Sequence, residues 1–409
     1  MQQRFTEIDL RALGLRLQEA RKARGFTQQE AADHIGVART TMTAIEKGER
    51  AVQPEELVRL AALYGRDLNE LLRRQEHLAD FSVQFRTSIN QQGLDSPEVS
   101  EVITEFKRLS EDYLELEGLC KSPLPRRYPP VYEIGDVPAE QAAEDVATAE
   151  RNRLGLGDGP IPNLRDVLEN DVGIRIFCLR MPSKIAALFG YTERVGGCIV
   201  LNGGHPPERQ RWSLAHEYAH FLTRRYQADV MVLTMYRRVP ESERFADAFA
   251  KFFLMPFTGL SRRFNELKRA RHGTITPADL VKLAHFYDVS FEALLRHIEG
   301  QRMLPAGTYE ELIDRGFKVR EAQGILQLLP HSAGCEMLPL RYQLLAAEAY
   351  QRELITEGQF ARFLRVDRLS ARELFESLSR NFTLSDEGNI SEIGLELGEP
   401  IASPRTQVS

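Results

Sequence analysis

Hydrophobic positions in residues 9–73 recur at the three- and four-residue spacing of helices, and helix-ending residues interrupt them. The pattern predicts five short helices. Gly25 and Gly48 end the first and the third, and Thr27 with Glu30 forms a capping box that starts the second. A short turn containing glycine separates the second helix from the third. Two helices joined in this way are the signature of a helix-turn-helix unit, whose second helix lies in the DNA major groove.

A longer helix is predicted to start at Ser96, with a hydrophobic residue at every third or fourth position. These positions form a seam of Val99, Val102, Phe106, Leu109, Tyr113 and Leu116. Such a seam can pair with the same helix of a second copy of the chain, which would bring two of the predicted helix-turn-helix units together. It can equally pack against its own chain, and the pattern leaves both options open. Five prolines between residues 121 and 138 then predict an extended linker and a domain boundary.

The middle of the chain changes from helical spacing to short β-type runs. Residues 173–177, 187–191 and 198–202 predict three strands, and a helix follows from about Pro207. Further helices are predicted over 276–298 and 339–380; we expect the first group to be core packing, although it imitates a helix-turn-helix. The expected fold is mainly α and multidomain: an all-α head, an α+β domain with a small sheet, and a helical C-terminal region. The expected segments are a head over 1–76, a connector over 77–138, the α+β domain over 139–300, a helical module over 301–384 and a disordered tail over 385–409.

Composition narrows the classes of protein to consider. The chain has 409 residues, 43% of them hydrophobic and 27% charged, which describes a soluble protein of several domains. Its net charge of −6 gives no general attraction to nucleic acid. Residues 1–77 hold 13 Lys and Arg against 12 Asp and Glu, so a DNA-binding head would need a dimer to double its phosphate contacts. We see no signal peptide and no membrane span, and expect a cytoplasmic protein without membrane contact.

The four cysteines, Cys120, Cys178, Cys198 and Cys335, lie far apart and form no C-x-x-C pair. We expect reduced thiols rather than a disulfide framework or a thiolate metal site.

The strongest chemical motif is H-E-x-x-H, formed by His216, Glu217 and His220. Residues four apart share one face of a helix, so both imidazoles can reach the same point. Neutral imidazoles are good zinc ligands, and Glu217 is placed to act as general base on an activated water. Two histidines that are merely buried helix residues are the simpler alternative.

A third ligand must come from the next predicted helix, which begins near Pro240. Glu243 and Asp247 are four apart and share a face there, so one carboxylate can bind zinc while the other holds a histidine ring by its second nitrogen. Glu241 is the competing ligand, but it has no such partner.

The segment Arg16–Leu72 resembles the XRE, or lambda-repressor-like, DNA-binding family. The resemblance is carried by Thr27-Gln28-Gln29-Glu30-Ala31-Ala32, Ile35-Gly36-Val37 and Ile45-Glu46-Lys47-Gly48-Glu49-Arg50. It implies that Arg39, Thr40 and Thr43 approach base edges, and that Gln28 and Lys47 meet phosphates. Ala38 stands where the family commonly has a capping Ser, so the third helix starts with a weaker cap.

Residues from about 140 to 300 resemble the ImmA/IrrE family of metallopeptidases. The resemblance rests on three blocks in order: Gly197–Asn202, Arg209–His220 and Glu243–Pro256. It implies that His216, His220 and Glu243 bind Zn²⁺ and that Glu217 activates the water. The family usually has Asn where Asp247 stands, and Leu-Gly where Tyr218-Ala219 stand. Neither change removes a ligand.

Together these features predict a DNA-binding transcriptional regulator with a zinc metalloendopeptidase domain of the H-E-x-x-H, gluzincin-like type. The resemblance implies a helix-turn-helix repressor as substrate, either a partner or the protein itself. Expected partners are a double-stranded operator, that protein substrate, a second copy in a homodimer, and single-stranded DNA as a trial activating signal. The alternative is a non-proteolytic XRE repressor or antitoxin-like regulator whose zinc domain senses a signal.

Overall fold

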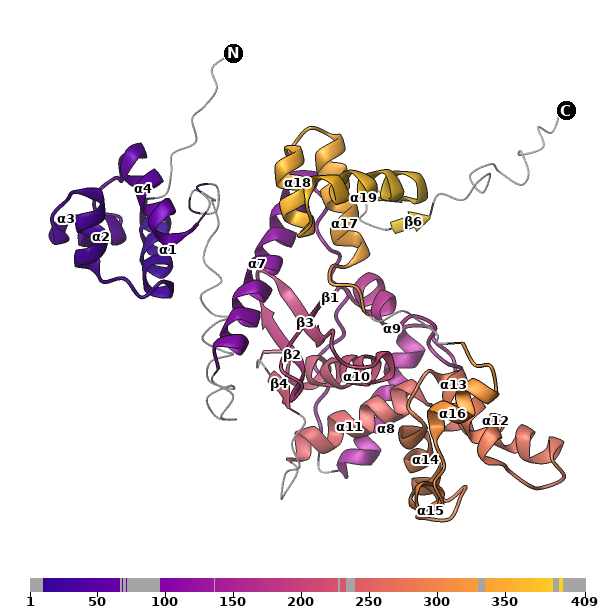
Figure 1. Ribbon diagram of the computed structural model, residues 1–409. Helices are drawn as coiled ribbons and strands as arrows, with labels where there is room; N and C mark the ends of the chain where they lie inside the picture. Colours follow the sequence, from indigo (N-terminus) through magenta and orange to yellow (C-terminus); the bar gives the residue numbers. More distant parts are fainter. Residues whose placement is uncertain are drawn as a thin grey trace, which may run out of the picture. The chain divides into compact units, whose positions relative to one another are not determined.

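The computed structural model describes residues 10–66, 68, 71, 96–135, 137–226, 229–232, 240–329, 335–384 and 390–392. The chain divides into two compact units, residues 1–79 and residues 80–409 (Figure 1). Both are mainly helical, and a small sheet lies in the middle of the sequence with helices before and after it. The predicted mainly α, multidomain fold class is therefore confirmed.

The first unit is a helical bundle. Its helices are α1 (Leu10–Ala23), α2 (Gln28–Ile35), α3 (Arg39–Glu46) and α4 (Pro54–Tyr64). The Thr27 hydroxyl accepts a hydrogen bond from Glu30 N, and the Glu30 carboxylate accepts one from Thr27 N, so the predicted capping box is confirmed. Gly36 ends α2 at φ 75°, a conformation that glycine adopts without a Cβ penalty. Ala38 starts α3 without a side-chain cap, as predicted.

An apolar core holds the bundle together. Its buried members include Leu13, Leu17, Ala32, Met42, Leu57, Leu60 and Tyr64. Helices α1 and α3 approach closely at Gly14, where a Cβ would lie 2.5 Å from the Ile45 carbonyl oxygen. Arg21 and Glu46 form a buried ion pair at 2.6 Å across the same two helices. Most of the predicted fifth helix falls outside the described residues, although Leu71 joins the core.

The second unit is built on a four-stranded sheet in the order β1-β3-β2-β4. The strands are β1 (Arg175–Leu179), β2 (Ile185–Thr192), β3 (Gly196–Asn202) and β4 (Asp229–Val232). Strands β1 and β3 are parallel, whereas β2 runs antiparallel to β3 and to β4. The three predicted strands are confirmed, and β4 is a fourth strand that the sequence pattern did not predict.

Helices cover both faces of this sheet (Figure 1). On one face lies α10 (Pro207–Arg224), where Phe221 meets Phe189 edge to face at 6.1 Å between ring centroids. On the other face lies α7 (Pro97–Cys120), where Phe106 and Tyr113 both contact Phe177. Every residue of β1 and β3 is buried, which explains why these strands are almost continuous apolar runs.

A helical core packs beyond α10. Its members are α8 (Ala139–Arg153), α9 (Leu164–Asp166) with a π-helical turn (Val167–Val172), α11 (Glu241–Leu254), α12 (Phe257–Ala270), α13 (Pro277–Tyr287) and α14 (Phe291–Gly300). Helix α11 packs against both α8 and α10. Leu280 and Leu294, from α13 and α14, are buried in this core, as the core-packing interpretation predicts.

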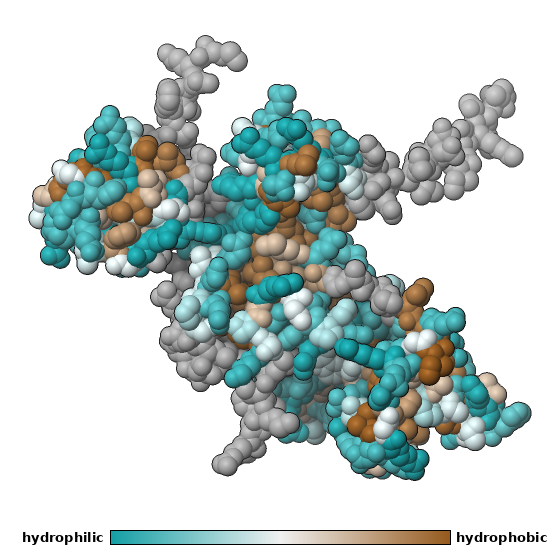
Figure 2. Space-filling model, viewed as in Figure 1, coloured by the Kyte–Doolittle hydropathy of each residue, from teal (hydrophilic) through white to brown (hydrophobic). Residues whose placement is uncertain are grey.

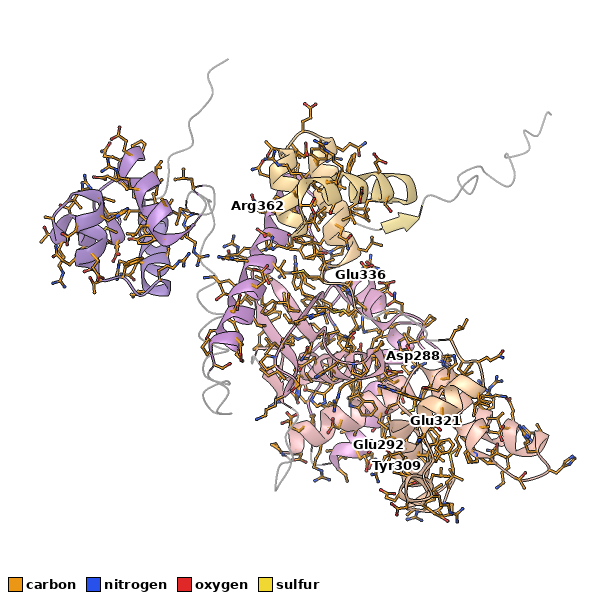
Figure 3. All side chains as sticks on the ribbon, in the orientation of Figure 1. Asp288, Glu292, Tyr309, Glu321, Glu336 and Arg362 are labelled. Atoms are coloured by element: carbon orange, nitrogen blue, oxygen red, sulfur yellow. A yellow bond between two sulfur atoms is a disulfide. The ribbon has the colours of Figure 1, made fainter. Side chains whose placement is uncertain are left out.

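The expected boundary at residue 300 does not separate two packing units. Helices α15 (Thr308–Asp314) and α16 (Val319–Ile325) continue onto the same core. Phe291 of α14 contacts both Tyr309 and Phe317, and Figure 3 shows Glu292 and Tyr309 side by side. Beyond them Ile325 and Leu329 are about 80% exposed, and Figure 2 shows hydrophobic surface in the region of α13 and α16.

The hydrophobic seam of α7 is covered by its own chain. All six seam residues are buried, and Tyr113 contacts Tyr342 of α17 (Leu340–Gln351) as well as Phe177 of β1. Helices α18 (Glu357–Leu364) and α19 (Arg368–Asn381) pack on α17. Of the two options that the spacing left open, packing within the chain is the one observed. The seam is therefore not a free surface for pairing two copies.

The proline-rich segment lies against the second unit instead of linking two independent units. Arg127 N donates to the Val172 carbonyl at 3.0 Å, and Tyr132 N donates to the Leu222 carbonyl at 2.9 Å. Near the end of the chain, β5 (Phe382–Leu384) pairs with β6 (Ile390–Glu392), and β6 falls within the tail that was expected to be disordered. The rest of that tail lies outside the described residues. None of the described helices is both long and apolar enough to cross a membrane.

The cysteine prediction is half right. Cys120 and Cys198 are free and buried, but Cys178 and Cys335 are joined by a disulfide with their Cα atoms 6.0 Å apart. The two residues are 157 positions apart, and only the fold brings them together. Sequence spacing carries no information on a pairing of this kind.

Candidate functional site

Helix α10 carries the H-E-x-x-H motif into the interior of the second unit. Pro207 stands in the first turn of α10, and the apolar side of this helix lies against β2 and β3. His216, Glu217 and His220 are 2%, 0% and 3% exposed. The Nε2 atoms of His216 and His220 are 3.1 Å apart, so the helical spacing does direct both rings to one point.

Glu243 of α11 completes a triangle of donor atoms. One of its carboxylate oxygens lies 3.3 Å from His216 Nε2, and the other lies 3.4 Å from His220 Nε2. Ligands about 2.0–2.2 Å from a tetrahedral zinc are roughly 3.3–3.6 Å from one another. The two imidazoles and the carboxylate therefore fit zinc in both chemistry and spacing. Glu241, the competing candidate, is exposed and does not belong to this group.

Asp247 lies one turn after Glu243 and holds the first histidine. Its Oδ1 is 3.0 Å from His216 Nδ1, so it accepts the ring proton and leaves Nε2 directed at the other donors. Burial lowers the pKa of His216, but the bonds to Asp247 and Glu243 outweigh burial and raise it above its ordinary value. Burial and the neighbouring His216 hold the pKa of His220 well below its ordinary value. His220 therefore stays neutral, which is the form that binds metal.

Arg224 is a site residue that the sequence reasoning missed. Its Nη2 donates to His220 Nδ1 at 2.9 Å and lies 3.9 Å from a Glu243 oxygen. It stands four residues after His220, so the same spacing rule that paired the histidines would have found it. A histidine that binds metal through Nε2 carries its proton on Nδ1, so metal binding would turn the guanidinium away from this nitrogen.

Tyr218, which departs from the family pattern, belongs to a buried polar network behind the motif. Its hydroxyl donates to the Glu150 carboxylate at 2.5 Å, and Arg153 and Tyr132 bind the same carboxylate. The network ties α10 to α8. Tyr218 therefore has a structural role, on the other side of α10 from the donor atoms.

The proposed DNA-binding residues lie on or beside α3 of the first unit. Arg39, Thr40 and Lys47 are exposed. Thr43 is partly buried, and its hydroxyl contacts Gln28 Oε1 at 3.2 Å. The Gln28 amide donates to the buried carboxylate of Glu46 at 2.8 Å, so this side chain is held within the unit. Two of the five residues thus belong to a network that orders the helix pair.

Comparison with known proteins matches a domain within each unit. Residues 12–73 match a helix-turn-helix domain. HTH-type transcriptional regulator AnsR of Bacillus subtilis (strain 168) is 33% identical over 99 residues, which cover 22% of this chain and 85% of that protein. The chain belongs to the helix-turn-helix transcriptional regulators. Residues 169–299 of the regulator match the IrrE N-terminal-like domain of the M78 peptidases, so the XRE-like head and the IrrE-like domain are both confirmed.

Two solved structures cover most of the regulator at low similarity. PlcR of Bacillus thuringiensis, in complex with the peptide PapR7 and DNA, is 12% identical, with 90% of this chain and 96% of that chain covered at a TM-score of 0.17. ComR from Streptococcus suis is 12% identical, with 91% and 89% covered at a TM-score of 0.16. Likeness at these scores carries no structural argument.

Proposed function

We propose that the regulator is a cytoplasmic DNA-binding protein with a zinc-dependent endopeptidase domain, which cleaves a repressor-type protein to switch gene expression. The observation that carries this proposal is the donor triangle of His216, His220 and Glu243 beside the buried Glu217. Three protein ligands of this type leave one position open, which is the usual arrangement of a catalytic zinc site. The match to the M78 peptidases supports the same reading.

The side chains divide the chemistry among them. Zinc bound by His216, His220 and Glu243 would supply Lewis-acid activation of a water molecule and of a peptide carbonyl. Glu217 would take a proton from that water on its carboxylate and deliver it to the nitrogen of the leaving amine. Asp247 keeps the His216 ring oriented while this happens.

The DNA-binding residues of the first unit suggest where the peptidase would act. Arg39, Thr40 and Lys47 project from the first unit and would contact a double-stranded operator. The peptidase would then cut the regulator itself, a neighbouring copy or another helix-turn-helix repressor, with single-stranded DNA as a trial signal. Because the charge of residues 1–77 is nearly balanced, we propose that two copies bind one operator, through a surface other than the α7 seam.

Zinc removal tests the proposed function directly. The purified full chain should hold one zinc ion and cleave candidate helix-turn-helix repressors, itself included, with operator DNA and single-stranded DNA each supplied in turn. A chelator should end cleavage and added zinc should restore it, while His220→Ala should lose both zinc and cleavage. Products are identified by mass spectrometry. Stoichiometric zinc and operator binding without cleavage under any trigger would support the alternative, a regulator that senses with its zinc domain.

Operator binding gives a separate prediction for the head. Arg39→Ala should weaken binding to an operator selected from random duplexes by about 10- to 100-fold, because a base-edge contact contributes about 1–3 kcal/mol. Lys47→Ala should lower the slope of log affinity against log salt by about one, as loss of one phosphate contact predicts. Arg59→Ala, which removes an equal charge from the exposed side of α4, is the control. An equal loss with Arg59→Ala would contradict the assignment.

A further inference from the structure

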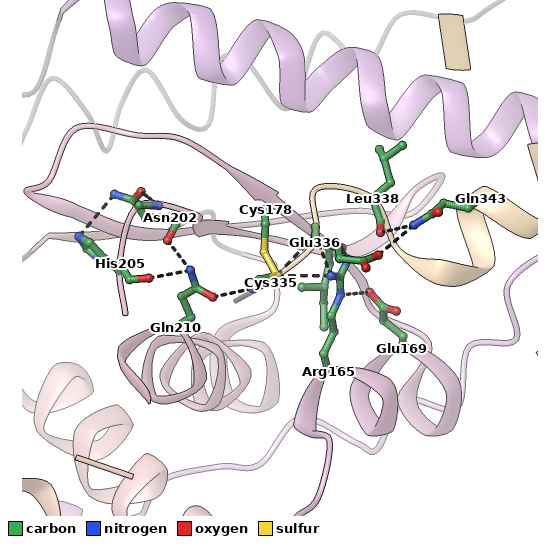
Figure 4. The surroundings of a disulfide bond; sticks show 12 residues. Arg165, Glu169, Cys178, Asn202, His205, Gln210, Cys335, Glu336, Leu338 and Gln343 are labelled. Atoms are coloured by element: carbon green, nitrogen blue, oxygen red, sulfur yellow. Dashed lines mark hydrogen bonds and ion pairs between the residues drawn. A yellow bond between two sulfur atoms is a disulfide. The ribbon is translucent and has the colours of Figure 1, made fainter. Parts of the chain in front are cut away.

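The disulfide joins the sheet of the second unit to the segment that leads into α17 (Figure 4). Cys178 lies in the edge strand β1 and is 5% exposed, whereas Cys335 is partly exposed. Cys178 N donates to the Met337 carbonyl at 3.1 Å, so residues 335–338 run along the edge of β1. The cytoplasm, where we propose that the regulator acts, is a reducing compartment. Disulfides of cytoplasmic proteins are mostly transient there, because cellular reductants open them. A long-range pair in such a protein therefore points to reversible chemistry.

Arg165 places a positive charge beside one of the two sulfur atoms, that of Cys335. Its Nη1 lies 3.4 Å from Cys335 Sγ and also donates to the Glu336 carbonyl. A guanidinium at this distance stabilises a thiolate, which is the nucleophilic form of cysteine. Glu169 binds the other side of Arg165, but burial raises the pKa of Glu169 to about 7, so near neutral pH it offsets only part of the positive charge. Cys335 is thus both the more exposed and the more activated of the pair.

The two free cysteines lie in the opposite environment. Burial raises the pKa of Cys120 and of Cys198 to about 11, so both remain protonated thiols. Cys120 also donates to the Leu345 carbonyl at 3.3 Å. The chain therefore contains its own unreactive controls.

Gln210 connects the disulfide to the helix of the zinc motif. Its Oε1 accepts a hydrogen bond from Cys335 N at 3.0 Å, and its amide donates to the carbonyls of Asn202 and His205 (Figure 4). Gln210 is buried in the first turn of α10. The position of residue 335 is thereby coupled to the start of the helix that carries His216 and His220.

We propose that Cys178 and Cys335 form a peroxide-responsive thiol switch, whose disulfide holds residues 335–338 against β1 and the first turn of α10. The peroxide transfers one oxygen to Cys335, which becomes a sulfenic acid as water leaves. The Cys178 thiol then attacks that sulfur, the S–S bond forms and a second water leaves. Two thiols and one peroxide thus give one disulfide and two waters. A dithiol reverses the reaction and is itself oxidised.

The test uses the full chain, reduced with dithiothreitol and then treated with hydrogen peroxide at a few molar equivalents. Differential alkylation and mass spectrometry should find Cys178 linked to Cys335, with Cys120 and Cys198 still reduced, and dithiothreitol should restore all four thiols. Cys120→Ser should behave as the wild type. Arg165→Ala should slow linkage about tenfold, and Arg165→Lys should recover most of the rate. A pair that is already linked in acid-trapped, unstressed cells, or that fails to form with peroxide, would overturn the switch.

Hydrogen exchange tests the coupling to α10 without any peptidase assay. Reduction of the wild-type protein should speed exchange at residues 335–338 and in the first turn of α10 by about tenfold or more. Chemical reduction avoids the risk that Cys335→Ser fails to fold. Cys120→Ser, which keeps the disulfide, is the control and should show the same change on reduction as the wild type. Equal exchange in the oxidised and reduced forms would show that the bond restrains nothing and would overturn the proposal.

Discussion

Glu217→Gln is expected to lower the rate of peptide cleavage by about 10³-fold or more while leaving zinc content unchanged. The amide has the size of the carboxylate but cannot take up a proton, and a positioned acid–base group contributes about 10²–10⁴-fold. Glu217 is fully buried, and it is not one of the three donor groups that would bind zinc. The rate is measured by mass spectrometry on the substrate identified with the wild type, with zinc determined in the same samples.

Glu241→Gln is the matched control for this change. Glu241 stands in the first turn of α11, is exposed and lies outside the donor group, so its replacement should leave both cleavage and zinc unchanged. Cleavage by Glu217→Gln at the wild-type rate would remove Glu217 from the mechanism. Loss of zinc from Glu217→Gln would instead assign this carboxylate a structural role.

Glu117→Ala is expected to destabilise the second unit by about 3–5 kcal/mol. The Glu117 carboxylate accepts hydrogen bonds from Arg175 Nη2 at 2.7 Å and from Arg341 Nη1 at 3.3 Å, and so joins α7, β1 and α17. Burial alone would lower the pKa of Arg175, but Glu117 outweighs it and raises the pKa, so this guanidinium stays charged. Removal of the carboxylate would take away a negative charge that two guanidinium groups, each 1% exposed, both contact.

Urea unfolding followed by tryptophan fluorescence measures this loss. Trp212 is the one tryptophan of the chain and lies on α10, so the signal reports on the second unit and not on the head. Arg372→Ala, which breaks an exposed pair with Glu357, should leave the unfolding midpoint close to that of the wild type. A Glu117→Ala midpoint as close to the wild type as that of the control would contradict the argument.

Local patterns predicted the features that depend on neighbouring residues. The capping box at Thr27 and Glu30, the missing cap at Ala38 and the convergence of His216 and His220 all follow from contacts within one turn of helix. Glu243 was also favoured over Glu241, because it shares a helix face with Asp247. These predictions used spacings of three and four residues, over which backbone geometry alone fixes the distances.

The features that the sequence left open or missed involve partners that are distant along the chain. Periodicity showed that one face of α7 is buried but could not show that β1 and α17 cover it. The phosphate contact predicted for Gln28 took no account of Glu46, whose carboxylate accepts a hydrogen bond from the same amide. The boundaries at residues 121–138 and at 300 were inferred from proline content and from family extent, neither of which reports on packing.

The sequence by itself determined the class of this regulator, the residues of its candidate metal site and most of its helices, because each depends on residue type and short spacing. Only the tertiary structure decided how near Glu243 comes to the two histidines, that Arg224 reaches His220, and that Cys178 meets Cys335. Those contacts join different elements or depend on side-chain conformation. Their distances are set by how the whole unit packs, a property that no short stretch of sequence contains.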